Sequence, residues 1–413
     1  MRMLSKLLVG TAGALAITAL VAGPAMADPP SRPRVNDVVG VGSDTSQFVL
    51  DQLSHDYNAQ HAGASQLLYS WDAVPQGSTI TEKAGGTGGD CTVTRPTGSS
   101  AGISALEANA TVTGGTGFCV DFARSSRARG TSDPGCSSGG ICFVALGGDA
   151  VTWATRSAAA GGTNAPATLT ATQIKNIYLC KAGSRNWSAF GGKAGTIKPF
   201  LPQSSSGTRS FFLTALGGGT AITPGPCVST NDGTGNGDNT LIENEGVAPA
   251  LNDANAIFPY SAGDFIAQAE HSAQCTNGTN CGYPAAPVCK PTTKQNKFGC
   301  DLHGVMQINP IGTSNPTKPF PPHVGACGGT TGNTCAVINA NFNKTFQRVI
   351  YDVVRFSGST TDNIPGYLEP FFAAANASTP GWACTNTKAK ADIKSYGFLA
   401  FSNSAPVHCG TVQ

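Results

Sequence analysis

Short apolar runs alternate with helical patterns along the first third of the chain. The run at residues 38–41 predicts a buried strand, and apolar residues then recur at helical spacing through Tyr57. Residues 67–71 and 119–123 predict two more strands, and residues 103–110 predict a helix between them. Strands that alternate with helices are typical of parallel α/β sheets, where ligands collect at the carboxyl ends of strands. The pattern therefore predicts an α/β protein with a binding site at such an edge.

A longer apolar stretch follows at residues 143–154, and its composition suits a buried central strand. Further along, residues 196–201 are strand-like, and residues 210–216 predict a helix that stops at Gly217. A chain of 413 residues exceeds what one hydrophobic core usually fills, so we expect two lobes.

The N-terminus has the features of a secretory signal. Two basic residues precede the apolar run 7–22, and small residues at 23–27 provide a cleavage site, which predicts a signal peptide over residues 1–27. A transmembrane anchor is the alternative, but the run is short and the cleavage site follows at once. No cysteine stands at the cleavage point to carry a lipid anchor. We therefore expect a secreted protein with no membrane span after cleavage.

All 14 cysteines lie beyond the predicted cleavage site. An even count in an oxidising compartment predicts disulfides, and three pairs would close short loops: Cys136 with Cys142, Cys275 with Cys281, and Cys327 with Cys335. Six others could close longer loops with open connectivity, namely Cys91, Cys119, Cys180, Cys227, Cys384 and Cys409. A zinc site at Cys300-x-x-His303 near Cys289 is the alternative, but no paired Cys-x-x-Cys accompanies it, so no metal is expected.

Charge is sparse along the chain. Only 12% of residues are charged and the formal net charge is +2. Without a basic run there is no indication of nucleic-acid binding, and without an acidic run there is none of a disordered tail. The abundant glycines fall into Gly/Ser/Thr loops that are typical of surface connections.

Three turns at predicted strand ends are rich in hydroxyl groups. They are residues 43–46, residues 124–127 and residues 204–209, and the first and third open predicted helices. Hydroxyls and free backbone N–H groups at a helix N-terminus bind anions, and Gly207 would let the backbone approach a ligand. Ordinary helix capping is the alternative for any single turn. The candidate ligand-binding residues are Ser43, Asp44, Thr45, Ser70, Arg124, Ser125, Ser126, Arg127, Ser206, Gly207, Thr208 and Arg209.

Motifs in a fixed order carry a family resemblance. Residues 40–45 come first, followed by Asp-Phe-Ala at 121–123, residues 169–178, Ser-Gly-Thr at 206–208 and residues 256–261. In this order they resemble the phosphate-type substrate-binding proteins of ABC transporters, over about residues 38–264. The resemblance implies a type II periplasmic-binding-protein fold, with two α/β lobes joined by two hinge strands and carrying disulfide-stapled loop insertions.

By the same resemblance, residues 28–150 and 258–413 would form the first lobe and residues 151–257 the second. A small inorganic anion, phosphate or a related oxyanion, would bind between them for uptake through an ABC-transporter permease. No cofactor and no catalysis are implied, and we expect a monomer.

The resemblance also implies ligand positions: Asp44, Thr45 and, less closely, Ser70 correspond to those of the first lobe, and residues 206–208 correspond to the donor turn of the second lobe. Two positions depart from the family pattern. Ser126 stands where the family has an acceptor aspartate, and Pro202 stands where it has an arginine. Asp44 could replace the acceptor. Three arginines could replace the cation because guanidinium suits bidentate anion contacts: Arg124, Arg127 and Arg209.

Two other classes of function remain open. A secreted serine hydrolase or phosphoesterase could use Ser100 in Gly-Ser-Ser-Ala-Gly, although the preceding segment is a poor strand. A secreted carbohydrate-binding or adhesion protein could use tryptophan side chains, although their spacing is irregular: Trp71, Trp153, Trp187 and Trp382.

Overall fold

The computed structural model describes most of the chain beyond the predicted signal peptide. The described residues are 28–29, 31–74, 76–84, 90–108, 110–111, 117–137, 139–234, 239–268, 306–312, 323–324, 337–339, 341–357, 364–372, 380–399 and 407–413. The predicted signal peptide, the predicted pairs Cys275–Cys281 and Cys327–Cys335, and the alternative zinc ligands all lie outside the described residues.

One eight-stranded sheet organises the molecule. Its strands, in spatial order, are β2 (Leu68–Ser70), β1 (Val38–Gly42), β5 (Phe122–Ser125), β14 (Gln347–Arg355), β6 (Ile141–Arg156), β9 (Ala256–Ser261) and β8 (Lys198–Pro199), with β10 (Met306–Asn309) also paired to β6. Strand pairs are parallel at both ends of this order and antiparallel where β14 and β6 lie. The predicted parallel arrangement therefore holds only toward the two ends, because β14 returns from the C-terminal region in the opposite direction.

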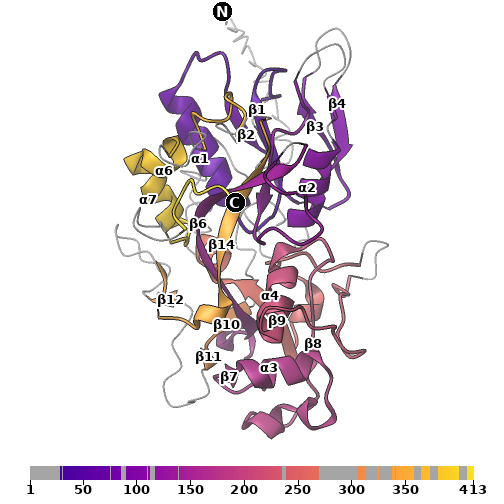
Figure 1. Cartoon of the computed structure of the whole chain (residues 1–413). Helices are drawn as coiled ribbons and strands as arrows, with labels where there is room; N and C mark the ends of the chain where they lie inside the picture. Colours follow the sequence, from indigo (N-terminus) through magenta and orange to yellow (C-terminus); the bar gives the residue numbers. More distant parts are fainter. Residues whose placement is uncertain are drawn as a thin grey trace, which may run out of the picture.

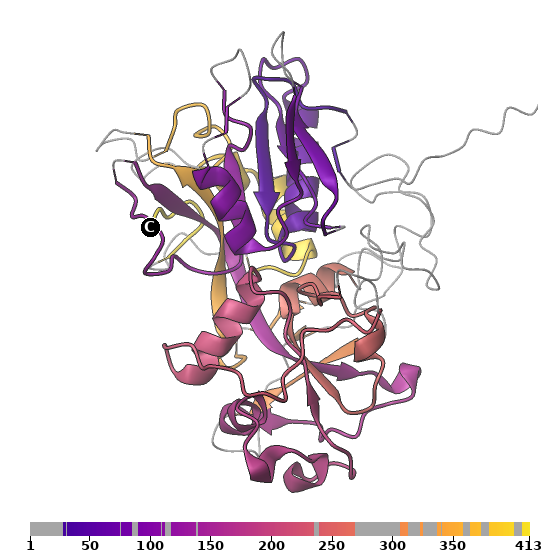
Figure 2. The same cartoon turned by 90° about the vertical axis from the view of Figure 1, so that its right-hand side faces the viewer.

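Two long strands, β6 and β14, connect an upper and a lower part of the molecule (Figures 1 and 2). The first half of β6 pairs with β14, and residues 151–156 pair with β9 and β10. The upper part carries α1 (Gln47–Gln60), α2 (Ser99–Glu107), α6 (Trp382–Thr385) and α7 (Thr387–Ser395). The lower part carries α3 (Ala171–Tyr178) and α4 (Gly207–Gly217).

Three two-stranded ladders complete the strands. They are β3 (Thr79–Lys83) with β4 (Cys91–Thr94), β7 (Leu169–Thr170) with β11 (Ile311–Gly312), and β12 (His323–Val324) with β13 (Val337–Ile338). Residues 262–268 are helical, and five short 3-10 turns lie at Ala158–Ala160, Ala182–Ser184, Trp187–Phe190, Pro249–Leu251 and Lys344–Phe346.

Separate hydrophobic clusters fill the two parts. In the upper part, Leu50 and Phe122 belong to one cluster and Ile103 and Phe143 to another. In the lower part, Trp153 and Trp187 are fully buried with their ring centroids 6.4 Å apart, so neither presents a face to a sugar. The apolar stretch predicted as a buried central strand is confirmed as β6, which is buried along nearly its whole length.

Part of the C-terminal region packs with the lower part. The strand β10 pairs with β6, β11 pairs with β7, and Ile338 and Phe346 join the cluster around Trp153. The division into residues 28–150, 151–257 and 258–413 stays a prediction.

Four disulfides confirm the predicted cysteine chemistry in the described residues: Cys91–Cys119, Cys136–Cys142, Cys180–Cys227 and Cys384–Cys409. The short pair Cys136–Cys142 is the one predicted from spacing. Among the described residues, no helix has both the length and the apolar character needed to cross a membrane.

Candidate functional site

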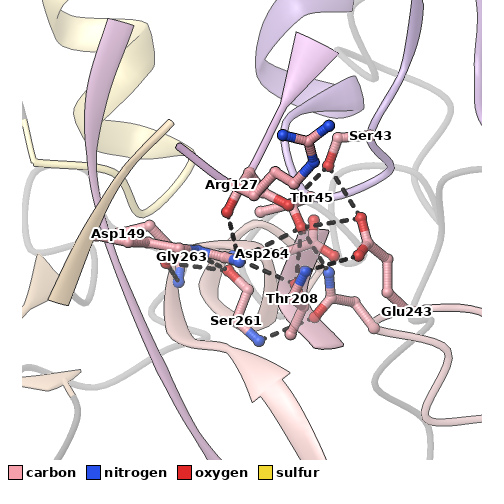
Figure 3. Close-up of polar contacts among 12 residues, drawn as sticks. Ser43, Thr45, Arg127, Asp149, Thr208, Glu243, Ser261, Gly263 and Asp264 are labelled. Carbon is pink, nitrogen blue, oxygen red and sulfur yellow. Dashed lines mark hydrogen bonds and ion pairs between the residues drawn. The ribbon is translucent and has the colours of Figure 1, made fainter. Parts of the chain in front are cut away.

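The candidate site lies where three segments meet between the upper and lower parts (Figure 3). Residues 43–46 follow β1, residues 124–127 span the end of β5, and Ser206 caps α4, which begins at Gly207. Because β1 and β5 are parallel neighbours, their carboxyl ends share one edge of the sheet. The N-terminus of α4 approaches this edge from the lower part, so the three hydroxyl-rich turns predicted from the sequence come together.

Close packing at Gly207 shows how tightly α4 approaches the upper part. A Cβ at this position would lie closer than 3.0 Å to the Oγ atoms of Ser99 and Ser126. Ser206 caps the helix, with its side chain accepting from the N–H of Arg209 at 3.0 Å. Gly207 therefore permits contact between two parts of the protein, a use of glycine that capping alone does not require.

The carboxylate of Glu243 lies at the centre of the site. Its Oε2 accepts from the Ser206 hydroxyl and from the backbone N–H of Thr208, the latter at 3.0 Å. Its Oε1 accepts from Ser43 Oγ at 2.9 Å and from Thr45 Oγ1 at 3.4 Å. Donors from the upper and the lower part thus converge on one anionic group (Figure 3).

Arg348, on β14, is a buried cation beside these donors. Its Nη2 donates to Thr208 Oγ1 at 3.0 Å, and its Nη1 donates to the backbone carbonyl of Ser126 at 2.8 Å. Its Nε and Nη2 reach Asp149 Oδ2 at 2.8 and 2.7 Å. Asp149 also accepts from Ser261 Oγ and from the N–H of Gly263. The guanidinium therefore contacts the second and third segments of the site through hydrogen bonds and lies 3.5 Å from Thr45 Oγ1 of the first, while Asp149 balances its charge.

Asn244 fixes the loop that carries Glu243. Its backbone is left-handed, with φ 57°, a conformation that asparagine tolerates better than most residues. Its side chain donates to Thr45 Oγ1 at 3.1 Å and accepts from the N–H of Ser261 at 2.8 Å. The backbone carbonyl of Asn244 accepts from the Tyr260 hydroxyl and from Gln268 Nε2.

Carboxyl groups in the site differ in protonation. Burial, and next the nearby charge of Glu243, raise the pKa of Asp44 well above its ordinary value. Burial alone would raise the pKa of Glu243 too, but hydrogen bonds from Asp44, Ser206 and the Thr208 N–H outweigh it and lower that pKa. Burial, followed by the charges of Asp149 and Glu243, raises the pKa of Asp264 well above its ordinary value. These opposite shifts favour the carboxylate form of Glu243 and the protonated form of Asp44.

The three arginines predicted as ligands have other contacts. Arg124 is fully buried and donates to the Ser43 carbonyl at 2.9 Å and to Ser70 Oγ at 2.7 Å. The hydroxyl of Ser70, another predicted ligand, is therefore bonded to Arg124. Arg127 pairs with Asp133.

Two further predicted residues make local contacts. Arg209 donates to the Pro202 carbonyl at 2.8 Å. Ser125 Oγ bonds the backbone of Arg127, donating to its carbonyl at 2.8 Å. The cation beside the hydroxyl donors is Arg348, which the sequence argument missed.

The serine-hydrolase alternative gains no base from this arrangement. Ser100 lies in the first turn of α2, and its Oγ accepts from Arg127 Nε at 3.1 Å. A guanidinium has no lone pair to take the serine proton, so this contact cannot activate a nucleophile.

The chain is similar to one known protein family and aligns with several solved structures. A family model described as a PBP superfamily domain matches residues 27–274. No curated protein sequence matches the chain. Among solved structures, one assigned as a phosphate ABC transporter substrate-binding protein, from Clostridium perfringens with bound phosphate, aligns at 14% identity, covering 89% of this chain and 100% of its own, with a TM-score of 0.48.

Two other solved structures align over similar lengths. An ABC-type phosphate transport receptor from Vibrio cholerae aligns at 16% identity, over 88% of this chain and 99% of its own, with a TM-score of 0.42. A phosphate-binding protein from Stenotrophomonas maltophilia aligns at 13% identity, over 89% and 91%, with a TM-score of 0.42. The family model covers more than half of the chain and confirms the resemblance carried by the ordered motifs, so the chain belongs to the PBP superfamily.

Proposed function

We propose that the protein is an extracytoplasmic solute-binding protein that captures a small oxyanion, phosphate above all, between two lobes. The observation that carries this proposal is the convergence of hydroxyl and N–H donors from both parts of the molecule on one anionic group. Ser43 and Thr45 contribute from one side, and Ser206 and Thr208 from the other. Such donors satisfy the several oxygens of an oxyanion, and the N-terminus of α4 adds a favourable dipole.

The lobes that we propose follow the sequence prediction. Residues 28–150 belong to the first lobe and residues 151–257 to the second, and the long strands β6 and β14 form the connection on which the lobes close. The pairing of β10 with β6 supports counting Met306–Asn309 with the second lobe. The signal-like segment 1–27 would export the chain, and a permease of the ABC type would receive the anion.

Asp44 is the proposed acceptor for the proton of a monohydrogen or dihydrogen anion. It is buried beside Thr45, and it takes over the part that an aspartate at the position of Ser126 would otherwise play. The carbonyl oxygen of the Asp44 carboxyl, whose pKa burial raises, would accept that proton, which phosphate and arsenate carry near neutral pH and fully ionised sulfate lacks. Replacing Asp44 with Ala removes this acceptor and should reduce the preference for phosphate over sulfate, as measured by calorimetry with both anions. An unchanged ratio of the two affinities would remove Asp44 from this role.

Calorimetry with phosphate, arsenate, sulfate and tungstate, extended to millimolar ligand, tests the function itself. The oxidised protein should bind phosphate, and Thr45→Val, which removes one of the hydroxyl donors, should weaken binding by about tenfold or more, because a hydrogen bond to a charged group contributes about 1.5–3 kcal/mol. Thr214→Val is the matched control: it makes the same substitution on α4, where the threonine hydroxyl bonds the Ser210 carbonyl, and should leave the affinity unchanged. Failure of all four anions to bind the folded protein would overturn the proposal.

A further inference from the structure

The proposed anion site already contains an anion that belongs to the chain. The two carboxylate oxygens of Glu243 accept bonds from four groups, two on each side of the site. The donors are the hydroxyls of Ser43, Thr45 and Ser206 and the backbone N–H of Thr208, the same groups that an external oxyanion would need. A free anion and the Glu243 carboxylate therefore cannot use these donors at the same time.

The cavity at the site is too small to hold a free phosphate together with the Glu243 carboxylate. The cavity beside Glu243, lined in part by Asp44, Gln47 and Asp264, measures about 10 Å³. A volume of about 10–15 Å³ holds a single water molecule, so phosphate does not fit beside the carboxylate. Binding of phosphate requires that Glu243 leave its place and that the two sides of the site move apart.

Hydrogen bonds hold the loop that carries Glu243 in place. Its own backbone N–H donates to Gln203 Oε1 at 3.0 Å, and Asn244 adopts a left-handed conformation under five hydrogen bonds or close polar contacts. A sparsely populated backbone conformation persists only where the surroundings determine it. Glu243 is thus positioned as firmly as the donors that face it.

Helix capping accounts for only half of these contacts. The bonds from Ser206 and from the Thr208 N–H would satisfy the first turn of α4 without any help from the upper part. The bonds from Ser43 and Thr45 instead connect Glu243 to the segment after β1, about 200 residues away in the chain. This second pair of contacts joins the two sides of the site.

We infer that Glu243 is a tethered competitor: its carboxylate occupies the oxyanion site, holds the two lobes together when no ligand is present, and sets the affinity for the external anion. The inference rests on the proposed function. A group tethered by a short segment acts at an effective concentration of about millimolar or more, so a free ligand must displace it. The observed affinity is then the intrinsic affinity multiplied by the fraction of molecules in which Glu243 has left the site.

Removal of the carboxylate should therefore tighten binding. Phosphate should bind Glu243→Ala at least about tenfold more tightly than the wild-type protein, and Glu243→Gln should show part of this gain because the amide keeps the volume and loses the charge. Asp253→Asn is the control, since it removes a carboxylate that pairs with Lys198 and does not line the cavity, and it should keep the wild-type affinity. Calorimetry with inorganic phosphate measures all four proteins, with circular dichroism to establish that each is folded.

Small-angle scattering in solution measures the radius of gyration of the same proteins and provides an independent test. Without ligand, Glu243→Ala should have a larger radius of gyration than wild type, and phosphate should reduce it again. Equal phosphate affinity and equal dimensions for wild type and Glu243→Ala would overturn the inference while leaving the proposed function intact. No phosphate binding by any of the proteins would overturn the proposed function, and the inference with it. If Glu243→Ala does not fold, Glu243→Gln decides: wild-type affinity in that variant overturns the inference.

Discussion

Asp149 and Arg348 form an ion pair at the connection between the two parts of the molecule. The side chain of Asp149 is fully buried and that of Arg348 is 2% exposed, with 2.7 Å between Nη2 and Oδ2. The pair lies on the long strands β6 and β14, and Arg348 also donates to Thr208 in the candidate site. We expect this pair to be the strongest electrostatic coupling between these two strands.

The magnitude follows from burial and from the remaining partners. Arg348→Met leaves the Asp149 carboxylate buried with only the neutral donors of Ser261 and Gly263, and Asp149→Asn leaves the guanidinium without a counter-ion. Breaking a buried pair by removal of one partner costs about 3–5 kcal/mol of unfolding free energy. The double variant contains neither charge, so it should lose less than the sum of the single losses, with a coupling energy of about 2–3 kcal/mol.

Urea denaturation of the four proteins in this double-mutant cycle measures the coupling, provided that two optical probes give coincident transitions. Lys198 and Asp253 provide the control cycle, because they form an equally direct ion pair but the lysine side chain is 52% exposed. Exposed pairs contribute at most about 1 kcal/mol, so the control coupling should be small. Losses at Asp149 and Arg348 that add to within about 0.5 kcal/mol would refute the reasoning.

Three further predictions concern stability and closure. Burial raises the pKa of Glu82 from 4.5 to about 7, so the folded protein binds this proton more tightly than the unfolded chain does. The free energy of unfolding should therefore fall by about 3 kcal/mol as the pH rises from 4.5 to 7. Glu82→Gln should remove that loss in urea denaturation at about pH 5 and 8, and the same pH dependence in the variant and the wild type would contradict the prediction. Replacing both cysteines of the Cys180–Cys227 pair with serine should lower the free energy of unfolding by about 4 kcal/mol, and the same change at Cys136–Cys142 should lower it by about 2 kcal/mol, because the first disulfide closes a longer loop. Equal losses of stability in the melting curves would argue against loop entropy as the cause. Gly207→Ala should enlarge the radius of gyration and weaken phosphate binding at least tenfold, since the added Cβ meets Ser126; unchanged scattering would show that the contact adapts.

Local pattern was enough to predict the elements that build the site. The strand at residues 38–41 and the helix after it are confirmed as β1 and α1, and the stretch at 143–154 is confirmed within β6. These predictions succeeded because the periodicity of apolar side chains is local information. The meeting of the first two hydroxyl-rich turns also followed, because β1 and β5 are parallel neighbours whose carboxyl ends share an edge, whereas the third turn reaches them from the lower part on α4.

Glu243 and Arg348 escaped the sequence argument for different reasons. Glu243 lies in a loop with no periodicity, and its partners Ser43 and Thr45 are about 200 residues distant, so no local signal identifies it. Arg348 had a usable signal. It is one of three charged residues in the otherwise mostly apolar strand β14, with Asp352 and Arg355, and Asp149 is the single acidic residue of the buried strand β6. Charges in buried strands require partners, and this would have suggested that Asp149 pairs with a cation on a neighbouring strand.

The balance of charge in the site limits the anion that it can exchange. Arg348 pairs with Asp149, and burial raises the pKa values of Asp44 and Asp264, which favours their uncharged forms beside the Glu243 carboxylate. A ligand that takes over the four donors while Glu243 withdraws toward water exchanges one anion for another. A singly charged ligand with its own proton makes this exchange at constant charge, and its proton can bond to Asp44. A fully ionised divalent anion adds a negative charge to a buried site in which Arg348 is already paired with Asp149, at a cost that grows with burial. The arrangement therefore favours a protonated oxyanion, which is the physical reason to place phosphate ahead of sulfate.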